Sequence, residues 1–186
     1  MSAPDVTSFF DKATNTVSHI AADTETKHCA IIDPLLDYDH ASGRTLTQSA
    51  AAIADHVTKQ GLSVAWIIDT HIHADHLSAA PYLKGKLGGK FGIGDRISQI
   101  QNTFGDVFNA PAEFRRDGSQ FDHLLADGET YKVGSIEARA IHTPGDTPAR
   151  MVHVIEDAAF VGDTLFMPDY GNRRLCLRPL YWWLAV

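Results

Sequence analysis

The sequence has few cysteines and no long apolar run, and both absences narrow the class of protein. Its two cysteines, Cys29 and Cys176, are too few and too far apart for a disulfide framework, so a reducing compartment is expected. Cys29 lies in the apolar run CAIID, where a free thiol behaves as a small hydrophobic side chain. The sequence has no basic-then-apolar leader and no apolar stretch long enough to span a bilayer. The prediction is therefore a cytoplasmic protein without a membrane partner.

Positive charge is also scarce. The 186 residues include 16 Lys and Arg against 23 Asp and Glu, a net charge of −7, and the basic residues are scattered along the chain. A nucleic-acid-binding surface needs clustered basic residues, so a nucleic-acid partner is not expected. Hydrophobic residues make up 44% of the chain and charged residues 21%, which is ordinary for one globular domain of this length.

The spacing of apolar residues predicts a mixed α/β chain. Residues 16–23 and 28–33 flank TETK as a hairpin, and 34–44 are expected to be a loop. Apolar residues from Leu46 to Val57 have helical spacing, with Gly61 as the stop. The remaining elements are expected as a buried strand over 63–69, a helix over 77–89, a strand over 90–94, a short helix over 96–104, and hairpins over 127–145 and 151–166 that turn at Gly134 and near Glu156.

Four potential metal ligands follow the predicted buried strand within six residues. In the stretch IIDTHIHADH they are His71, His73, Asp75 and His76. Close side chains in a loop can converge on one ion, which needs three or more donors at about 2.0–2.3 Å. Sites of α/β folds gather beyond the carboxyl ends of strands, and a helix starting near Leu77 would place an anion-binding end beside Asp75 and His76. Solvated loop histidines are the alternative, but the dense spacing favours a metal site.

The segment THIHADH resembles the metal-binding signature of the metallo-β-lactamase superfamily. The blocks AIIDP, HLSAAPYL, HTPGDTP and FVGDTLF extend the likeness from residue 9 to about 171. Their order and spacing are most similar to the persulfide dioxygenase branch, next to the glyoxalase II branch. The resemblance implies the α/β (α+β type) class and an αββα sandwich over residues 1–171 with metals at one edge between the sheets. Its C-terminal part is expected to be incomplete, followed by an atypical tail over 172–186.

The likeness to persulfide dioxygenases implies a single non-haem Fe²⁺ held by His71, by the residue after Gly145, and by Asp163. That middle residue is Asp146, where the family has histidine. Non-haem iron oxygenases use two imidazoles and one carboxylate, so His73 could supply the missing imidazole. Asp146 is either a ligand or an ordinary turn aspartate. A carboxylate beside an apolar strand is costly unless it is ionised and coordinated, so Asp163 is predicted to be a ligand.

The likeness to glyoxalase II implies a different metal set. In those Zn²⁺ hydrolases, His73 would also bind the first ion, Asp75 and His76 would hold a second ion, and Asp163 would bridge the two. They also need a histidine well downstream of Asp163, whereas the last histidine here is His153. His142 is expected to be a strand-end histidine with a backbone partner and not a ligand.

The resemblance implies a reaction in which glutathione persulfide is oxidised with O₂ to sulfite and glutathione. A thioester hydrolase acting on a substrate such as S-lactoylglutathione is the second hypothesis, and a non-catalytic fragment that at most binds a metal is the third. The resemblance implies that Arg173 and Arg174 lie near the family's contacts for glutathione, with solvated surface residues as the equal alternative in the altered tail. The ending from Gly171 departs from the family pattern, which suggests a changed reading frame. Loss of the family's second half would uncover apolar surface on the remaining sheet, which predicts aggregation or a homodimer, unless the tryptophans of LYWWLAV cover that surface. The central expectation is that His71 and Asp163 share one cation.

Overall fold

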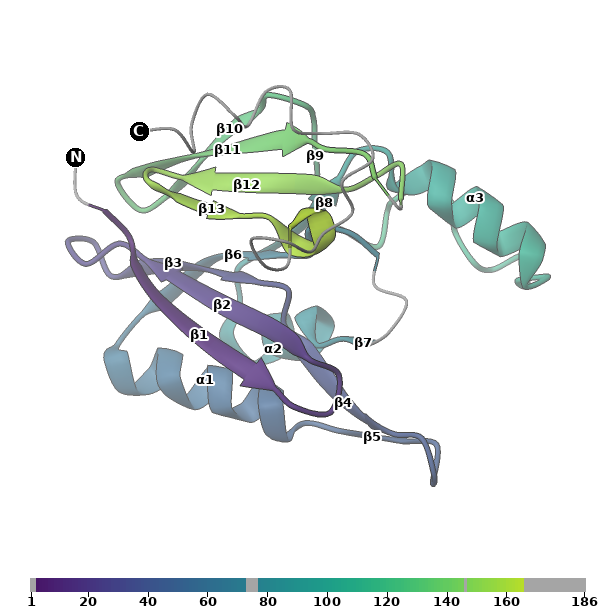
Figure 1. Ribbon diagram of the computed structural model, residues 1–186, viewed down its shortest axis with the longest axis horizontal. Coiled ribbons are helices and arrows are strands. Elements are labelled where there is room, and N and C mark those ends of the chain that lie inside the picture. The colour runs from purple at the N-terminus through teal and green to yellow at the C-terminus, as the bar shows by residue number, and fades with distance from the viewer. Residues whose placement is uncertain (1–2, 73–76, 146, 166–186) are drawn as a thin grey trace.

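Two β-sheets face each other in the computed structural model, which describes residues 3–72, 77–145 and 147–165 (Figure 1). The first sheet has the order β1 (Asp5–Asp11), β2 (Thr16–Ala22), β3 (His28–Ile32), β6 (Ser63–Ile68), β8 (Lys90–Gly94) and β9 (His123–Leu125). Strands β1 to β3 pair antiparallel, and β3, β6, β8 and β9 pair parallel. The parallel strands therefore end at one edge of the sheet, where the polar segment after β6 begins.

The second sheet is antiparallel throughout and consists of β10 (Thr130–Val133), β11 (Ile136–His142), β12 (Met151–Ile155) and β13 (Ala158–Phe160). A small third sheet has the order β5 (Arg44–Leu46), β4 (Leu35–Asp39) and β7 (Leu77–Ser78). The helices are α1 (Gln48–Gln60), α2 (Ala80–Leu87), α3 (Ile97–Val107) and the short 3-10 helix η1 (Gly162–Thr164). In Figure 1, α1 and α2 cover the face of the first sheet that points away from the second, and α3 extends outward at one side.

Two apolar cores lie on opposite faces of the first sheet. Successive side chains of a strand point to opposite faces, so Cys29 and Ile31 of β3 pack against the helices while Ala30 and Ile32 pack against the second sheet. Cys29 is fully buried, as predicted, and burial raises the pKa of its thiol to about 12. In the described ranges, no helix is long and apolar enough to cross a membrane.

Most of the predicted elements are confirmed. The hairpin of β2 and β3, the strands β6 and β8, and the helix α3 form where the apolar patterns indicated. Helix α1 ends at Gly61, which has the left-handed φ of 65° that favours glycine. The two late hairpins turn at Gly134 and at Glu156–Asp157, as predicted.

Three predictions near the third sheet are wrong. Residues 34–44 do not form a loop throughout, since β4 pairs with β5 and also with β7. Leu46, predicted on the apolar face of a helix, lies in β5 and is 55% exposed. The helix expected near Leu77 begins at Ala80, because residues 77–78 are used in the ladder with β4 and Pro81 is tolerated only in the first turn of a helix.

A buried aspartate joins the two large sheets at the β2–β3 turn. The Asp23 carboxylate accepts hydrogen bonds from the Thr26 hydroxyl at 2.6 Å, and from the Ser135 backbone N–H and hydroxyl, both at 2.7 Å. These hydrogen bonds, led by those from the Thr26 and Ser135 side chains, hold the pKa of Asp23 well below its usual value. Ser135 belongs to the β10–β11 turn, so this carboxylate connects segments that are 112 residues apart.

Candidate metal centre

The segment that follows β6 carries three buried polar residues. Asp69, Thr70 and His71 are 3%, 0% and 2% exposed, respectively. The Met151 backbone N–H of β12 donates to the Thr70 carbonyl at 2.9 Å. This bond fixes the end of β6 against the second sheet. His71 therefore lies at the edge between the sheets, where the family likeness had placed the metals.

The structure brings His71 and Asp163 together. The His71 Nε2 atom lies 3.3 Å from Asp163 Oδ2. Two donors that each bind one ion at about 2.0–2.2 Å, with tetrahedral to octahedral angles, are separated by about 3.0–3.4 Å. Asp163 comes from η1, directly after the second sheet, so the pair joins residues 92 positions apart in the sequence (163 − 71). This spacing fits a shared metal ion, and the closeness that the central expectation required is present.

The neighbours of His71 determine which ring nitrogen faces Asp163. The Thr70 hydroxyl donates its proton to Asp33 Oδ2 at 2.8 Å and also lies 2.9 Å from His71 Nδ1. Because a hydroxyl has one proton, its oxygen accepts the second bond from the His71 Nδ1–H. In the neutral imidazole, the nitrogen that carries the lone pair is then Nε2, which faces Asp163. This is the arrangement in which a histidine ligand is held by a hydrogen bond from its other nitrogen.

Asp33 is itself held firmly. Its other carboxylate oxygen accepts the Thr70 backbone N–H at 2.7 Å, its own N–H donates to the Ile68 carbonyl, and the Ser18 hydroxyl donates to its carbonyl at 2.8 Å. Asp33 has φ +48°, a left-handed conformation that an aspartate adopts only when its surroundings fix it. The chain Asp33–Thr70–His71 therefore holds the His71 ring in one orientation.

Gly162 lies directly against this support. A Cβ at position 162 would be 2.5 Å from the Thr70 hydroxyl and 3.4 Å from His71 Nδ1. Its φ of +46° is also left-handed. Glycine is therefore required here both by the backbone conformation and by the close approach of the segment that carries Asp163.

Arg150 is a feature of the site that sequence reasoning missed. Its side chain is 0% exposed, and Nη2 lies 3.7 Å from Asp163 Oδ2, the same oxygen that faces His71. A fully buried guanidinium is rare unless an anion faces it, and Asp163 is such an anion. The Asp163 side chain is 34% exposed, so the expectation that burial alone would require its coordination is too strong.

The other predicted ligands fall outside the described residues. They are His73, Asp75, His76 and Asp146. Within residues 3–72, 77–145 and 147–165, no group of three or more His, Cys, Asp or Glu residues could hold a metal ion. Of the predicted ligands, the described residues include His71 and Asp163, which form the described part of the candidate centre. Arg173 and Arg174, the predicted glutathione contacts, and the tail over 172–186 also lie outside the described part.

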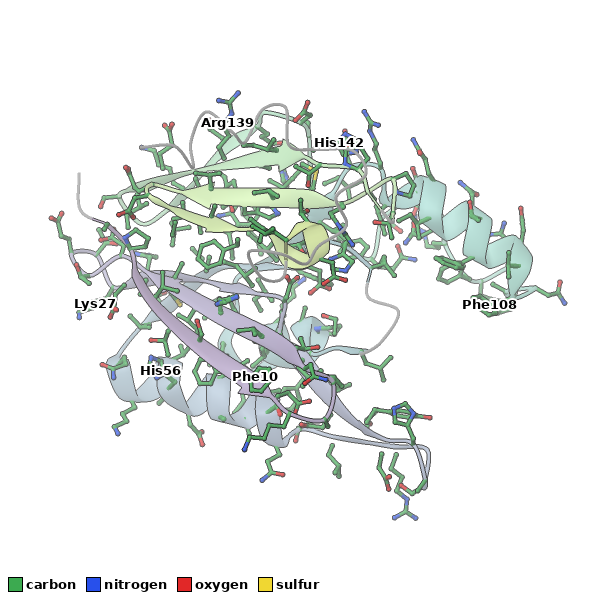
Figure 2. The ribbon with its side chains drawn as sticks, in the orientation of Figure 1. Phe10, Lys27, His56, Phe108, Arg139 and His142 are labelled. Atoms are coloured by element: carbon green, nitrogen blue, oxygen red, sulfur yellow. The ribbon has the colours of Figure 1, made fainter. Side chains whose placement is uncertain are left out.

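Two further histidines have roles away from a metal. His142, labelled in Figure 2 at the end of β11, has its Nε2 2.7 Å from the Pro148 carbonyl, which confirms the predicted backbone partner. His153 is fully buried in β12, where Nδ1 contacts the Tyr131 hydroxyl at 3.0 Å and Nε2 has no partner among the described residues. Burial lowers the pKa of His153 to about 4, so it is neutral at physiological pH.

One of the missed residues did have a signal in the sequence. Asp33 follows the apolar strand 28–32 just as Thr70 and His71 follow the strand 63–68. Neighbouring parallel strands end at one edge, so polar residues at both ends are expected to meet there. Arg150 had no comparable signal, because an arginine before an apolar strand is usually solvated.

The chain matches one family model and is similar to several known proteins. Residues 16–186 match the family described as the Metallo-beta-lactamase superfamily. The chain is 51% identical over 179 residues to a probable metallo-hydrolase of Burkholderia pseudomallei (strain 1710b), covering 91% of this chain and 61% of that protein. It is 46% identical over 157 residues to glyoxylase B2 of Dictyostelium discoideum, covering 83% and 54%. The mitochondrial persulfide dioxygenase ETHE1 of Homo sapiens is more distant, at 25% identity over 177 residues, covering 92% and 58%.

A solved structure shares the fold. ETHE1 from Myxococcus xanthus matches with a TM-score of 0.65 at 20% identity, over 90% of this chain and 63% of that one. At this identity the likeness shows the fold alone, and the predicted fold class is confirmed. The chain spans 61% and 54% of the Burkholderia and Dictyostelium relatives, less than two thirds of each.

Proposed function

The chain belongs to the metallo-beta-lactamase superfamily, and on that premise we propose that it is a metal-dependent persulfide dioxygenase. The superfamily binds metals, and we propose one Fe²⁺ per chain, with Zn²⁺ as the alternative ion. The substrate is glutathione persulfide, with Arg173 and Arg174 as contacts for its carboxylates. Water and O₂ are consumed, the S–S bond breaks, and sulfite, glutathione and protons are released. The electrons lost by the outer sulfur pass to O₂ and to the inner sulfur.

One observation carries this proposal. The His71 Nε2 and Asp163 Oδ2 atoms lie 3.3 Å apart, with the Nε2 lone pair directed by the Thr70 hydroxyl. A histidine and a carboxylate are two of the three donors that non-haem iron enzymes use. We propose His73 as the second imidazole, since Asp146 occupies the position where the dioxygenase pattern has histidine. Iron bound there would supply redox chemistry and a positive charge that attracts a persulfide anion.

The residues of this chain have distinct tasks in the proposed reaction. His71 and Asp163 hold the ion, while Asp33 and Thr70 keep the His71 ring in one orientation. A fixed first ligand places the reacting groups with little loss of entropy at the moment of reaction. The Arg150 guanidinium adds positive charge beside Asp163.

A thioester hydrolase is the second candidate. It is favoured by the similarity to the probable metallo-hydrolase and to glyoxylase B2, which are more alike in sequence to this chain than the persulfide dioxygenases. A hydrolytic centre would use Asp75 and His76 for a second ion and would lower the pKa of a bound water. The last histidine of the chain, His153, precedes Asp163 and is buried in the core, so it cannot serve as the downstream ligand.

The test compares two substrates and two metals on the same preparations. We expect the purified chain loaded with Fe²⁺ to consume O₂ with glutathione persulfide, and to release sulfite. His71→Ala and Asp163→Ala should lose bound iron and O₂ consumption together, whereas the exposed His40→Ala should retain both. If the Zn²⁺-loaded chain hydrolyses S-lactoylglutathione and the Fe²⁺-loaded chain does not consume O₂, the dioxygenase proposal is refuted and the hydrolase is the function.

A second variant tests the proposed role of Asp146. Asp146→His would complete two imidazoles and one carboxylate with His71 and Asp163. We expect this variant to hold more iron per chain and to consume O₂ faster than the original chain. Equal iron content and equal rates would mean that His73, or another donor, already fills the position.

A further inference from the structure

Arg150 places a permanent positive charge beside the Asp163 carboxylate, which is a proposed metal ligand. Arg150 Nη2 and His71 Nε2 are 3.7 Å and 3.3 Å, respectively, from the same atom, Asp163 Oδ2. An ion bound to Asp163 Oδ2 at about 2.1 Å would lie at most about 5.8 Å from Arg150 Nη2, because the ion–oxygen distance adds to the 3.7 Å between Oδ2 and Nη2. An arginine cannot relieve this repulsion by losing a proton.

The burial of Arg150 makes the charge effective. Its side chain is 0% exposed, so water screens it poorly from a neighbouring ion. Its position is also constrained, because the Arg150 carbonyl accepts the Thr143 N–H at 3.0 Å and the next residue, Met151, donates to the Thr70 carbonyl. These bonds hold the Arg150 backbone beside the segment that carries His71.

We propose that Arg150 competes with the metal ion for Asp163 and thereby sets a low metal affinity for this centre. This inference rests on the proposed metal centre of His71 and Asp163. In the metal-free chain, the guanidinium balances the charge of Asp163. When metal binds to Asp163, the same positive charge opposes it, so the occupancy of the centre follows the supply of metal.

The test removes the charge while keeping the length of the side chain. Arg150→Met is matched by Arg150→Lys, which keeps the charge, and each is titrated with Zn²⁺ alone by calorimetry. We expect Arg150→Met to bind Zn²⁺ at least tenfold more tightly than the original chain, and Arg150→Lys to stay within threefold of it. A purely structural role predicts the opposite sign, since damage to the site would weaken binding in both variants.

The outcomes separate this inference from the proposed centre. If Arg150→Met binds Zn²⁺ no more tightly than the original chain, or if Arg150→Lys gains as much as Arg150→Met, the competition is refuted. If Arg150→Met does not fold, Arg150→Gln is judged by the same criterion. His71→Ala is titrated in parallel. If His71→Ala binds Zn²⁺ as tightly as the original chain, the proposed centre itself is wrong. If His71→Ala binds Zn²⁺ more weakly but Arg150→Met shows no gain in affinity, only the proposed role of Arg150 is refuted.

Discussion

Replacement of Thr70 by valine tests the support of the proposed metal ligand His71 without changing His71 itself. Valine keeps the shape of threonine but removes the hydroxyl that joins Asp33 to His71. Thr70 is fully buried, so water cannot take the place of that hydroxyl without rearrangement. The His71 ring would then lose the acceptor that keeps its proton on Nδ1.

The structure sets the expected magnitudes. The lost bonds are one from a hydroxyl to the Asp33 carboxylate and one from His71 Nδ1 to a neutral oxygen, which together stabilise the fold by about 2–4 kcal/mol. The Thr70 backbone N–H still donates to Asp33, so the carboxylate keeps one partner. Loss of such a supporting bond typically weakens metal binding by about 10–100-fold. We therefore expect Thr70→Val to show both a lower free energy of unfolding and weaker Zn²⁺ binding.

Urea unfolding and Zn²⁺ titration of the same samples measure both effects. Ser18→Ala is the matched control, because it removes another buried hydroxyl that bonds to Asp33, but at the backbone carbonyl and not at the carboxylate. We expect Ser18→Ala to lose stability while retaining metal affinity, and Thr70→Ser to restore much of both. If Thr70→Val loses stability but binds Zn²⁺ as tightly as the original chain, Thr70 does not orient His71.

Three further predictions concern pH and packing. Because the pKa of Asp23 is lowered in the folded chain, its carboxylate stabilises the fold at pH values above its unfolded pKa of about 3.9. This contribution is lost as the pH falls through the folded pKa, so Asp23→Asn should be less stable at pH 7 and show a weaker acid dependence of urea unfolding. His153, with a folded pKa of about 4 against about 6.5 unfolded, should cost stability as the pH falls from about 6.5 to 4. His153→Leu should remove that loss in the same unfolding series. Gly162→Ala should weaken Zn²⁺ binding, since the added Cβ would displace Thr70, and unchanged affinity in a titration would count against the close approach.

The sequence predicted those elements whose pattern is local. Alternating and helical spacing located β2, β3, β6 and α1, because burial on one face or on both is visible in neighbouring residues. The pairing of β4 with β7 was missed, since β7 is distant in the sequence and supplies only two residues. The β4–β5 hairpin was missed because all three residues of β5 are exposed and show no buried pattern. Leu46 shows the same limit: an apolar residue next to a helix start was assigned to the helix face, whereas strand pairing placed it on the surface.

The features of the candidate centre were also predictable from the sequence only in part. The pairing of His71 with Asp163 followed from the family likeness, which carries information on long-range contacts that spacing alone does not contain. The support by Asp33 was open to prediction from the shared edge of parallel strands. The burial of Arg150 was not, because it depends on how η1 approaches β12 in three dimensions.

A double-mutant cycle on Zn²⁺ affinity tests most directly whether His71 and Asp163 share one ion. His71→Ala, Asp163→Ala and the double variant are titrated under identical conditions, with folding verified by urea unfolding. Two ligands of one ion are expected to be non-additive, so the double variant should bind little more weakly than either single variant. Additive losses, or unchanged affinity in both single variants, would contradict a shared ion.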